Sequence, residues 1–158
     1  MNTVATWLVR YGHVLAAGVR VGGYALLAFV VVPLLEREPS ATVGRLAVTA
    51  VRVLTYAGTL TVGFGLVLIT YTRGVVSLFR GGEWGFLVIA SFLAAIALFG
   101  IGDGALRPAL VRLAAGEGDG GDGKGGRKMG KARRFAVIGF ALTALTVGMM
   151  TRAVYAGS

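Results

Sequence analysis

Apolar and polar positions alternate along the chain in long blocks, which divide it into four apolar segments with short polar connections. The apolar segments run over residues 7–35, 43–72, 85–113 and 135–156, and each exceeds the ~20 residues that a helix needs to cross a bilayer core. A span must satisfy its backbone hydrogen bonds internally, so these segments are predicted to be helices. The predicted fold is all-α: a single antiparallel four-helix transmembrane bundle of up-down topology over residues 1–158.

Composition supports an integral membrane protein. The chain of 158 residues is 56% hydrophobic and 15% charged, whereas soluble domains are about 25% charged. Its net charge of +9 indicates cytoplasmic loops and contact with anionic headgroups of the lipid bilayer, and no RNA or DNA motif indicates a nucleic-acid partner. The absence of cysteine excludes disulfides, thiolate zinc or copper sites and iron–sulfur clusters.

The basic residues predict an orientation in the membrane. Most of them lie beside the first and third connections, and the third, residues 116–131, is glycine-rich and predicted to be a flexible loop. The positive-inside rule places both connections in the cytoplasm and both termini outside, in the cytoplasmic membrane. Aromatic residues that favour the headgroup level agree with this, because they gather at the predicted outer ends of the helices: Trp7, Tyr11, Tyr71, Trp84 and Tyr155.

Among the charged residues of the four segments, three lie well away from the segment ends. Counted from the aromatic residues at ~1.5 Å per residue, Arg52 and Asp103 both lie ~28 Å deep, and we expect an ion pair between them. The alternative is that each side chain extends separately to cytoplasmic water. Arg20 lies ~20 Å deep, where a charge needs compensation.

No acidic residue shares the depth of Arg20. Its candidate partners are water, an anionic group of a bound ligand, an acidic residue on a partner helix, or hydroxyl groups of the second and fourth helices: Thr59, Thr61, Thr143 and Thr146.

His13 is the only histidine, and it lies seven residues before Arg20, hence on nearly the same helix face. Its depth of ~3–9 Å matches that of Met149 and Met150 at ~8 Å. Histidine with methionine is a ligand set for Cu(I) or for a haem. The alternative is a hydrogen-bonded histidine near the interface beside ordinary methionine packing. No catalytic residues are predicted, because no acid shares the depth of His13.

Three segments resemble the copper resistance protein D (CopD)-like family of membrane proteins. They are "GHVLAAGVRVGGYALLAFVVVPLL" over residues 12–35, "GFLVIASFLAAIALFGIGDGALRPAL" over residues 85–110, and "RRFAVIGFALTALTVG" in the fourth helix. The resemblance implies a four-helix module linked to copper. The more distant likeness to HemJ-type protoporphyrinogen oxidases implies haem b held by His13. The third helix of this family often contains a lysine, but this chain has Ala90 and Ser91 there. It therefore lacks a residue that marks the HemJ-type enzymes.

The leading expectation is a CopD-like multi-pass membrane protein, not itself an enzyme, that handles or senses copper or haem near the outer end of the bundle. One alternative is a non-catalytic accessory subunit of a larger membrane complex. Another is a haem-linked membrane redox enzyme. A second copy of the chain or another membrane subunit remains open as a partner.

Overall fold

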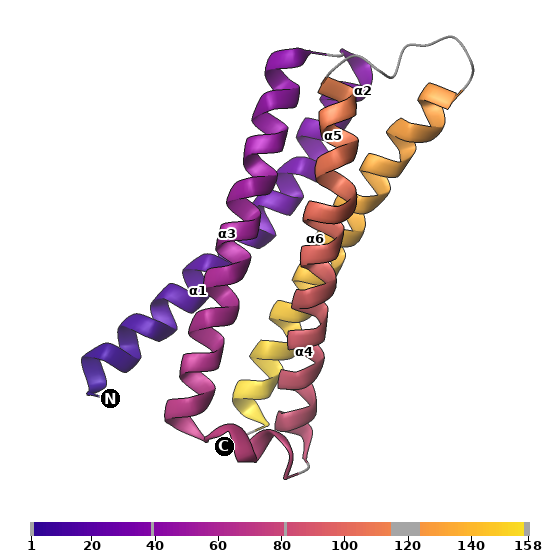
Figure 1. Cartoon of the computed structure of the whole chain (residues 1–158). Coiled ribbons are helices and arrows are strands. Elements are labelled where there is room, and N and C mark those ends of the chain that lie inside the picture. The colour runs from indigo at the N-terminus through magenta and orange to yellow at the C-terminus, as the bar shows by residue number, and fades with distance from the viewer. Residues whose placement is uncertain (1, 39, 81, 115–123, 157–158) are drawn as a thin grey trace.

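A computed structural model describes residues 2–38, 40–80, 82–114 and 124–156, and within these ranges every regular element is helical. Four helical stretches are long and apolar enough to cross a membrane: Thr3–Arg37, Ala41–Thr72, Glu83–Arg112 and Gly130–Tyr155. They run alternately up and down, and the chain begins and ends at the same end of the bundle (Figure 1). We call this the terminal end. The predicted all-α four-helix architecture is confirmed.

The first span contains three consecutive elements: α1 (Thr3–Leu26), a π-helical turn η1 (Leu27–Val31), and α2 (Val32–Arg37). Asn2 caps α1, because its side-chain oxygen accepts a hydrogen bond from the Ala5 amide at 2.8 Å. Pro33 would normally break a helix, since it lacks an N–H and its ring meets the carbonyl of the preceding turn. The wide turn η1 lies directly before Pro33, and there Val32 N–H bonds Leu27 O, so the span continues past the proline.

The second span is a single helix, α3 (Ala41–Thr72), and Ser40 caps its first turn. The turn to the third span contains a short 3₁₀ helix, η2 (Val75–Leu78), between Gly74 and Gly82. These two glycines have φ of 77° and 117°, values that side chains rarely tolerate. The third span is α4 (Glu83–Phe99), the π-helical segment η3 (Gly100–Leu106) and α5 (Arg107–Ala114). A wide turn again lies just before a proline, Pro108.

The fourth span lies within α6 (Lys124–Tyr155), which begins earlier than the predicted start at residue 135. The flexible loop predicted over residues 116–131 is therefore helical from Lys124 onward, and residues 116–123 lie outside the described residues. The early start has a local cause. Lysine, arginine, methionine and alanine are strong helix formers, and they outnumber the glycines over residues 124–134.

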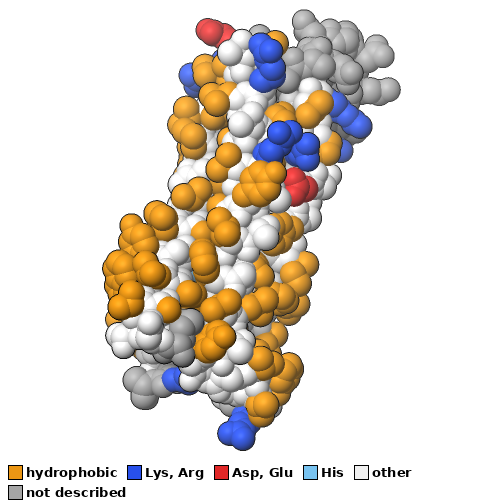
Figure 2. All heavy atoms as spheres, turned by 60° about the vertical axis from the view of Figure 1, so that its left-hand side comes forward, with side chains coloured by type: hydrophobic (Ala, Val, Ile, Leu, Met, Phe, Trp, Pro, Cys, Tyr) orange, Lys and Arg blue, Asp and Glu red, His pale blue; other side chains and the backbone are white. Residues whose placement is uncertain are grey.

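Packing is that of a protein surrounded by lipid. α1 packs chiefly against α3, and α4 against α6. A core of buried aliphatic residues joins the four spans toward the end opposite the termini, with Leu27, Val32, Leu35, Leu98 and Leu106 almost fully buried. Large apolar side chains also cover the outside, and Lys and Arg gather toward that opposite end (Figure 2). The chain is therefore a multi-pass membrane protein by the length and composition of its helices.

Candidate functional site

His13 is held against α3 by one hydrogen bond. Its Nδ1 lies 2.9 Å from the backbone oxygen of Thr61, and the ring is half-buried. A carbonyl oxygen can only accept, so Nδ1 carries the proton and Nε2 keeps a free lone pair. Gly65 makes this contact possible, because a Cβ at that position would lie 3.2 Å from His13 Cε1. A histidine that donates from Nδ1 to a backbone carbonyl has the arrangement found in many metal-ligating histidines.

The methionines predicted to meet His13 lie on another helix. Met149 and Met150 are half-buried on α6, which packs chiefly against α4, whereas the polar contact of His13 is with α3. Among the described residues, the hydrogen bond of the imidazole goes to α3 and none goes to either thioether. In the described part of the chain, no group of three or more His, Cys, Asp or Glu residues is placed to hold a metal ion.

Arg20 is buried, with 4% of its surface exposed. Its guanidinium carbon lies 5.3 Å from the centre of the Phe99 ring, and a Cβ on Gly58 would come within 3.0 Å of that carbon. Tyr24, one turn further along α1, is its electrostatic neighbour. A charge in the middle of a span costs roughly 2.5–3.5 kcal/mol, and a cation–π contact offsets about 0.5–2 kcal/mol of that. The aromatic contact therefore leaves part of the cost uncompensated.

The hydroxyl groups expected to compensate Arg20 are used within their own helices. Each donates to the carbonyl one turn back: Thr59 to Thr55, Thr61 to Ala57, Thr143 to Gly139 and Thr146 to Leu142. None of them accepts a hydrogen bond from Arg20, whose buried Nε has no partner in the structure. This pattern is usual for threonine in helices. Of the candidate partners predicted for Arg20, water and an external anionic group remain.

Tyr24 joins three spans, and sequence reasoning assigned it no role. Its ring is 2% exposed, and its hydroxyl donates to the Leu98 carbonyl at 3.3 Å. Two glycines make room for it: a Cβ at Gly139 would lie 2.5 Å from the ring, and one at Gly102 would lie 3.1 Å from the hydroxyl oxygen. The sequence did contain one signal for this role. Tyr24 lies away from both headgroup levels, and a tyrosine hydroxyl buried there needs a hydrogen-bond partner.

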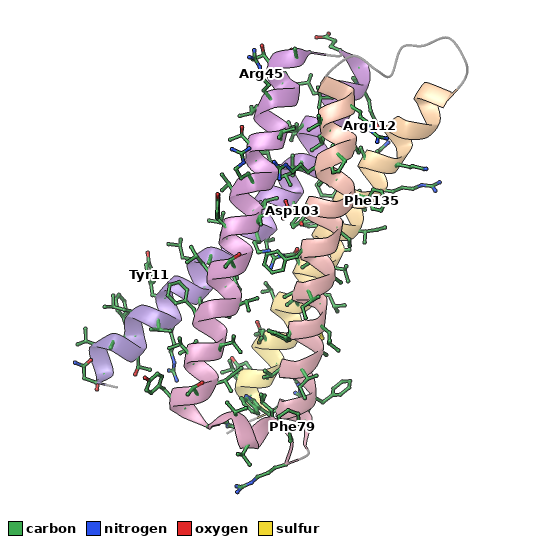
Figure 3. The ribbon with its side chains drawn as sticks, in the orientation of Figure 1. Tyr11, Arg45, Phe79, Asp103, Arg112 and Phe135 are labelled. Carbon is green, nitrogen blue, oxygen red and sulfur yellow. The ribbon has the colours of Figure 1, made fainter. Side chains whose placement is uncertain are left out.

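Asp103 has different neighbours from the one predicted. Thr55 donates to its Oδ2 at 3.0 Å, and Arg107, one turn along the same span, lies 3.9 Å from Oδ1. Arg52 is exposed on α3. The expected ion pair between Arg52 and Asp103 is not formed in the structure, although Asp103 does lie between the second and third spans (Figure 3).

An ion pair at the terminal end was not foreseen. Arg152 of α6 donates from Nε to Glu83 Oε1 at 2.6 Å and from Nη2 to Oε2 at 3.3 Å. Both side chains are exposed. Nearby, Arg73 lies over the ring of Trp84 at 5.0 Å. Figure 3 shows the aromatic side chains of Tyr11 and Phe79 toward this end and Arg45 and Arg112 toward the other.

Comparisons with protein-family models, with curated proteins and with solved structures found no match for this chain. α1 presents two unusual groups on one face: an imidazole with a free Nε2 and a buried guanidinium with an unpartnered Nε. The first can donate a lone pair to a metal centre, and the second can bind an anion.

Proposed function

We propose that this protein binds haem within the membrane through Nε2 of His13. The observation that carries the proposal is the hydrogen bond from Nδ1 of His13 to the Thr61 carbonyl at 2.9 Å. That bond fixes the ring orientation and the tautomer in which Nε2 has a lone pair to offer to a metal, as in many metal-binding histidines. The resemblance of residues 12–35 to the CopD-like family, with its link to haem-binding relatives, agrees with this assignment.

The residues present fit a haem better than a bare copper ion. Four donors of a haem iron come from the porphyrin, so the protein needs to add only one or two axial ligands. A copper site needs several protein donors in one place, whereas Met149 and Met150 lie on α6 and the described hydrogen bond of His13 goes to α3. A haem bound here would supply a redox-active iron. The proposal assigns binding to this chain and no catalytic residue.

The accessory-subunit alternative draws less support from the geometry. It requires an acidic side chain of a partner helix at Arg20, and the backbone of another helix cannot pack close to a guanidinium that is 4% exposed. The apolar outer surface is what lipid requires, and it does not by itself indicate a protein partner. We therefore place the haem site first.

An absorption spectrum of the purified protein after haem addition tests the proposal. We expect a Soret band in the wild type that His13→Ala abolishes, and recovery of the band when imidazole is added to His13→Gly. Thr61→Ala is the matched control, because it keeps the backbone carbonyl that holds His13, and it should bind haem as the wild type does. Metal analysis accompanies the spectra. If the wild type binds copper, His13→Ala does not, and no Soret band is seen, the ligand of His13 is copper and not haem.

A further inference from the structure

The guanidinium of Arg20 is a buried cation that lacks a hydrogen-bond acceptor at Nε. Neither of the two ion pairs found among the described residues includes it. Phe99 lies against the guanidinium, but an aromatic ring attracts a cation without providing a lone pair in the plane of the N–H groups. Arg20 therefore has a charge and an Nε donor without an acceptor among the described residues, while the Tyr24 hydroxyl is a neighbour of the rest of the guanidinium.

Arg20 and His13 lie on the same face of α1, because seven residues make nearly two helical turns. Both contact α3, His13 at the Thr61 carbonyl and Arg20 at Gly58. Their separation along the helix axis is about 10 Å. This distance is comparable to that between the iron of a porphyrin and the carboxylates at its edge.

The stretch of α1 around His13 is thinly covered by the other spans. The buried residues of α1 begin at Ala16, and Figure 1 shows the N-terminal half of α1 leaning away from α4 and α6. The proposed ligand would lie along this half of α1, whose chief neighbour is α3. To meet a carboxylate of that ligand, the Arg20 side chain would have to change rotamer away from Phe99 and Gly58.

We infer that Arg20 binds a carboxylate of the same haem whose iron His13 ligates. The inference rests on the proposed haem function and names the second group that selects the ligand. Arginine pairs with carboxylates through parallel N–H donors, and such charge-assisted bonds are stronger away from water. The ligand class is thus a metalloporphyrin with free acid side chains, and the same macrocycle with esterified side chains is a poorer ligand.

The test compares haem with its dimethyl ester in titrations of the full chain followed by the Soret band. The wild type should bind haem about 10- to 100-fold more tightly than the diester, the range expected when a hydrogen bond to a charged group is lost. Arg20→Gln should weaken haem binding by a similar factor while it leaves diester binding unchanged. Arg20→Lys, which keeps the charge, should recover part of the haem affinity. Arg10→Gln is the matched control, because it removes an exposed arginine from the same helix.

Equal affinity of the wild type for haem and diester overturns the inference, and this result does not depend on whether any Arg20 variant folds. The inference is also overturned if Arg20→Gln and Arg10→Gln weaken haem binding by the same factor. In both cases His13 can still ligate the iron, so the proposed function stands. Absence of a Soret band in the wild type with either compound would instead refute the proposed function itself.

Discussion

The contact between Tyr24 and Gly139 makes the packing of α1 on α6 testable by a single added methyl group. A Cβ at Gly139 would lie 2.5 Å from Cε1 and 2.7 Å from Cδ1 of Tyr24. The ring is 2% exposed and its hydroxyl is bonded to the Leu98 carbonyl, so it cannot move aside freely. Gly139→Ala therefore forces apart two spans that the tyrosine holds in contact.

The expected magnitude follows from a comparison within the same helix. Overpacking a well-packed core costs typically about 1–3 kcal/mol, whereas replacing glycine by alanine inside a helix gains about 1 kcal/mol from helix propensity. Gly148 of α6 has open space around its Cβ position, so Gly148→Ala receives the propensity gain alone. Because this gain is common to both variants, Gly139→Ala should be less stable than Gly148→Ala by about 1–3 kcal/mol.

The free energy of unfolding can be measured for both variants in detergent micelles by titration with a denaturing detergent. A double variant with Tyr24→Leu removes the ring that the methyl group meets, so the two substitutions should be non-additive, with part of the Gly139→Ala cost recovered. Equal stability of Gly139→Ala and Gly148→Ala would refute the assigned contact between the first and fourth spans.

The remaining predictions concern the imidazole, the polar contact between the second and third spans, and the topology. Gly65→Ala should weaken haem binding, because its Cβ would lie 3.2 Å from the His13 ring, and Gly63→Ala, with open space around it, should not; equal Soret titrations would contradict this. Thr55→Val should lower the free energy of unfolding by about 1 kcal/mol, and an unchanged value would show that its hydroxyl bond to a carboxylate does not stabilise the fold. Single cysteines introduced near either terminus and within residues 116–123 should label from opposite sides of intact vesicles, and labelling from one side would contradict the predicted orientation.

The four spans could be predicted from the sequence because their signal is additive along the chain. Nearly all residues from 85 to 99 contribute to the apolar length of the third span, and no single contact decides it. The wide turns before Pro33 and Pro108 were not predicted. A proline usually marks the end of a helix in water, but in a span the backbone has no water to bond, so the helix changes register and continues. The spans predicted over residues 7–35 and 85–113 already extend past these prolines, and the wide turns are how the backbone does so.

The contacts of Tyr24 could not be predicted, because they depend on how helices distant in sequence are set against one another. Gly139 and Gly102 are ordinary among 26 glycines until the first helix brings a ring against them. The hydrogen bond from His13 to a backbone carbonyl is similar, since any residue type at position 61 would offer the same acceptor. Sequence reasoning singled out the imidazole and the arginine, but it had no means to find partners that leave no residue-specific signal.

The different partners of Asp103 show what counting depth along a helix leaves out. Depth places a side chain along the membrane normal, and it put Arg52 and Asp103 at one level. Pairing also needs the side chains to face each other around their helix axes. The buried residues of α3 are Gly44, Ala47, Val51, Leu54, Ala57 and Gly58, and Arg52 follows Val51 by one residue, about 100° around the helix. It is exposed and lies about 60° around the helix from Thr55, the residue that donates to Asp103. The spacing of four residues between Asp103 and Arg107 was the signal present in the sequence, because it places the two charges on one side of a single helix without any assumption about its neighbours.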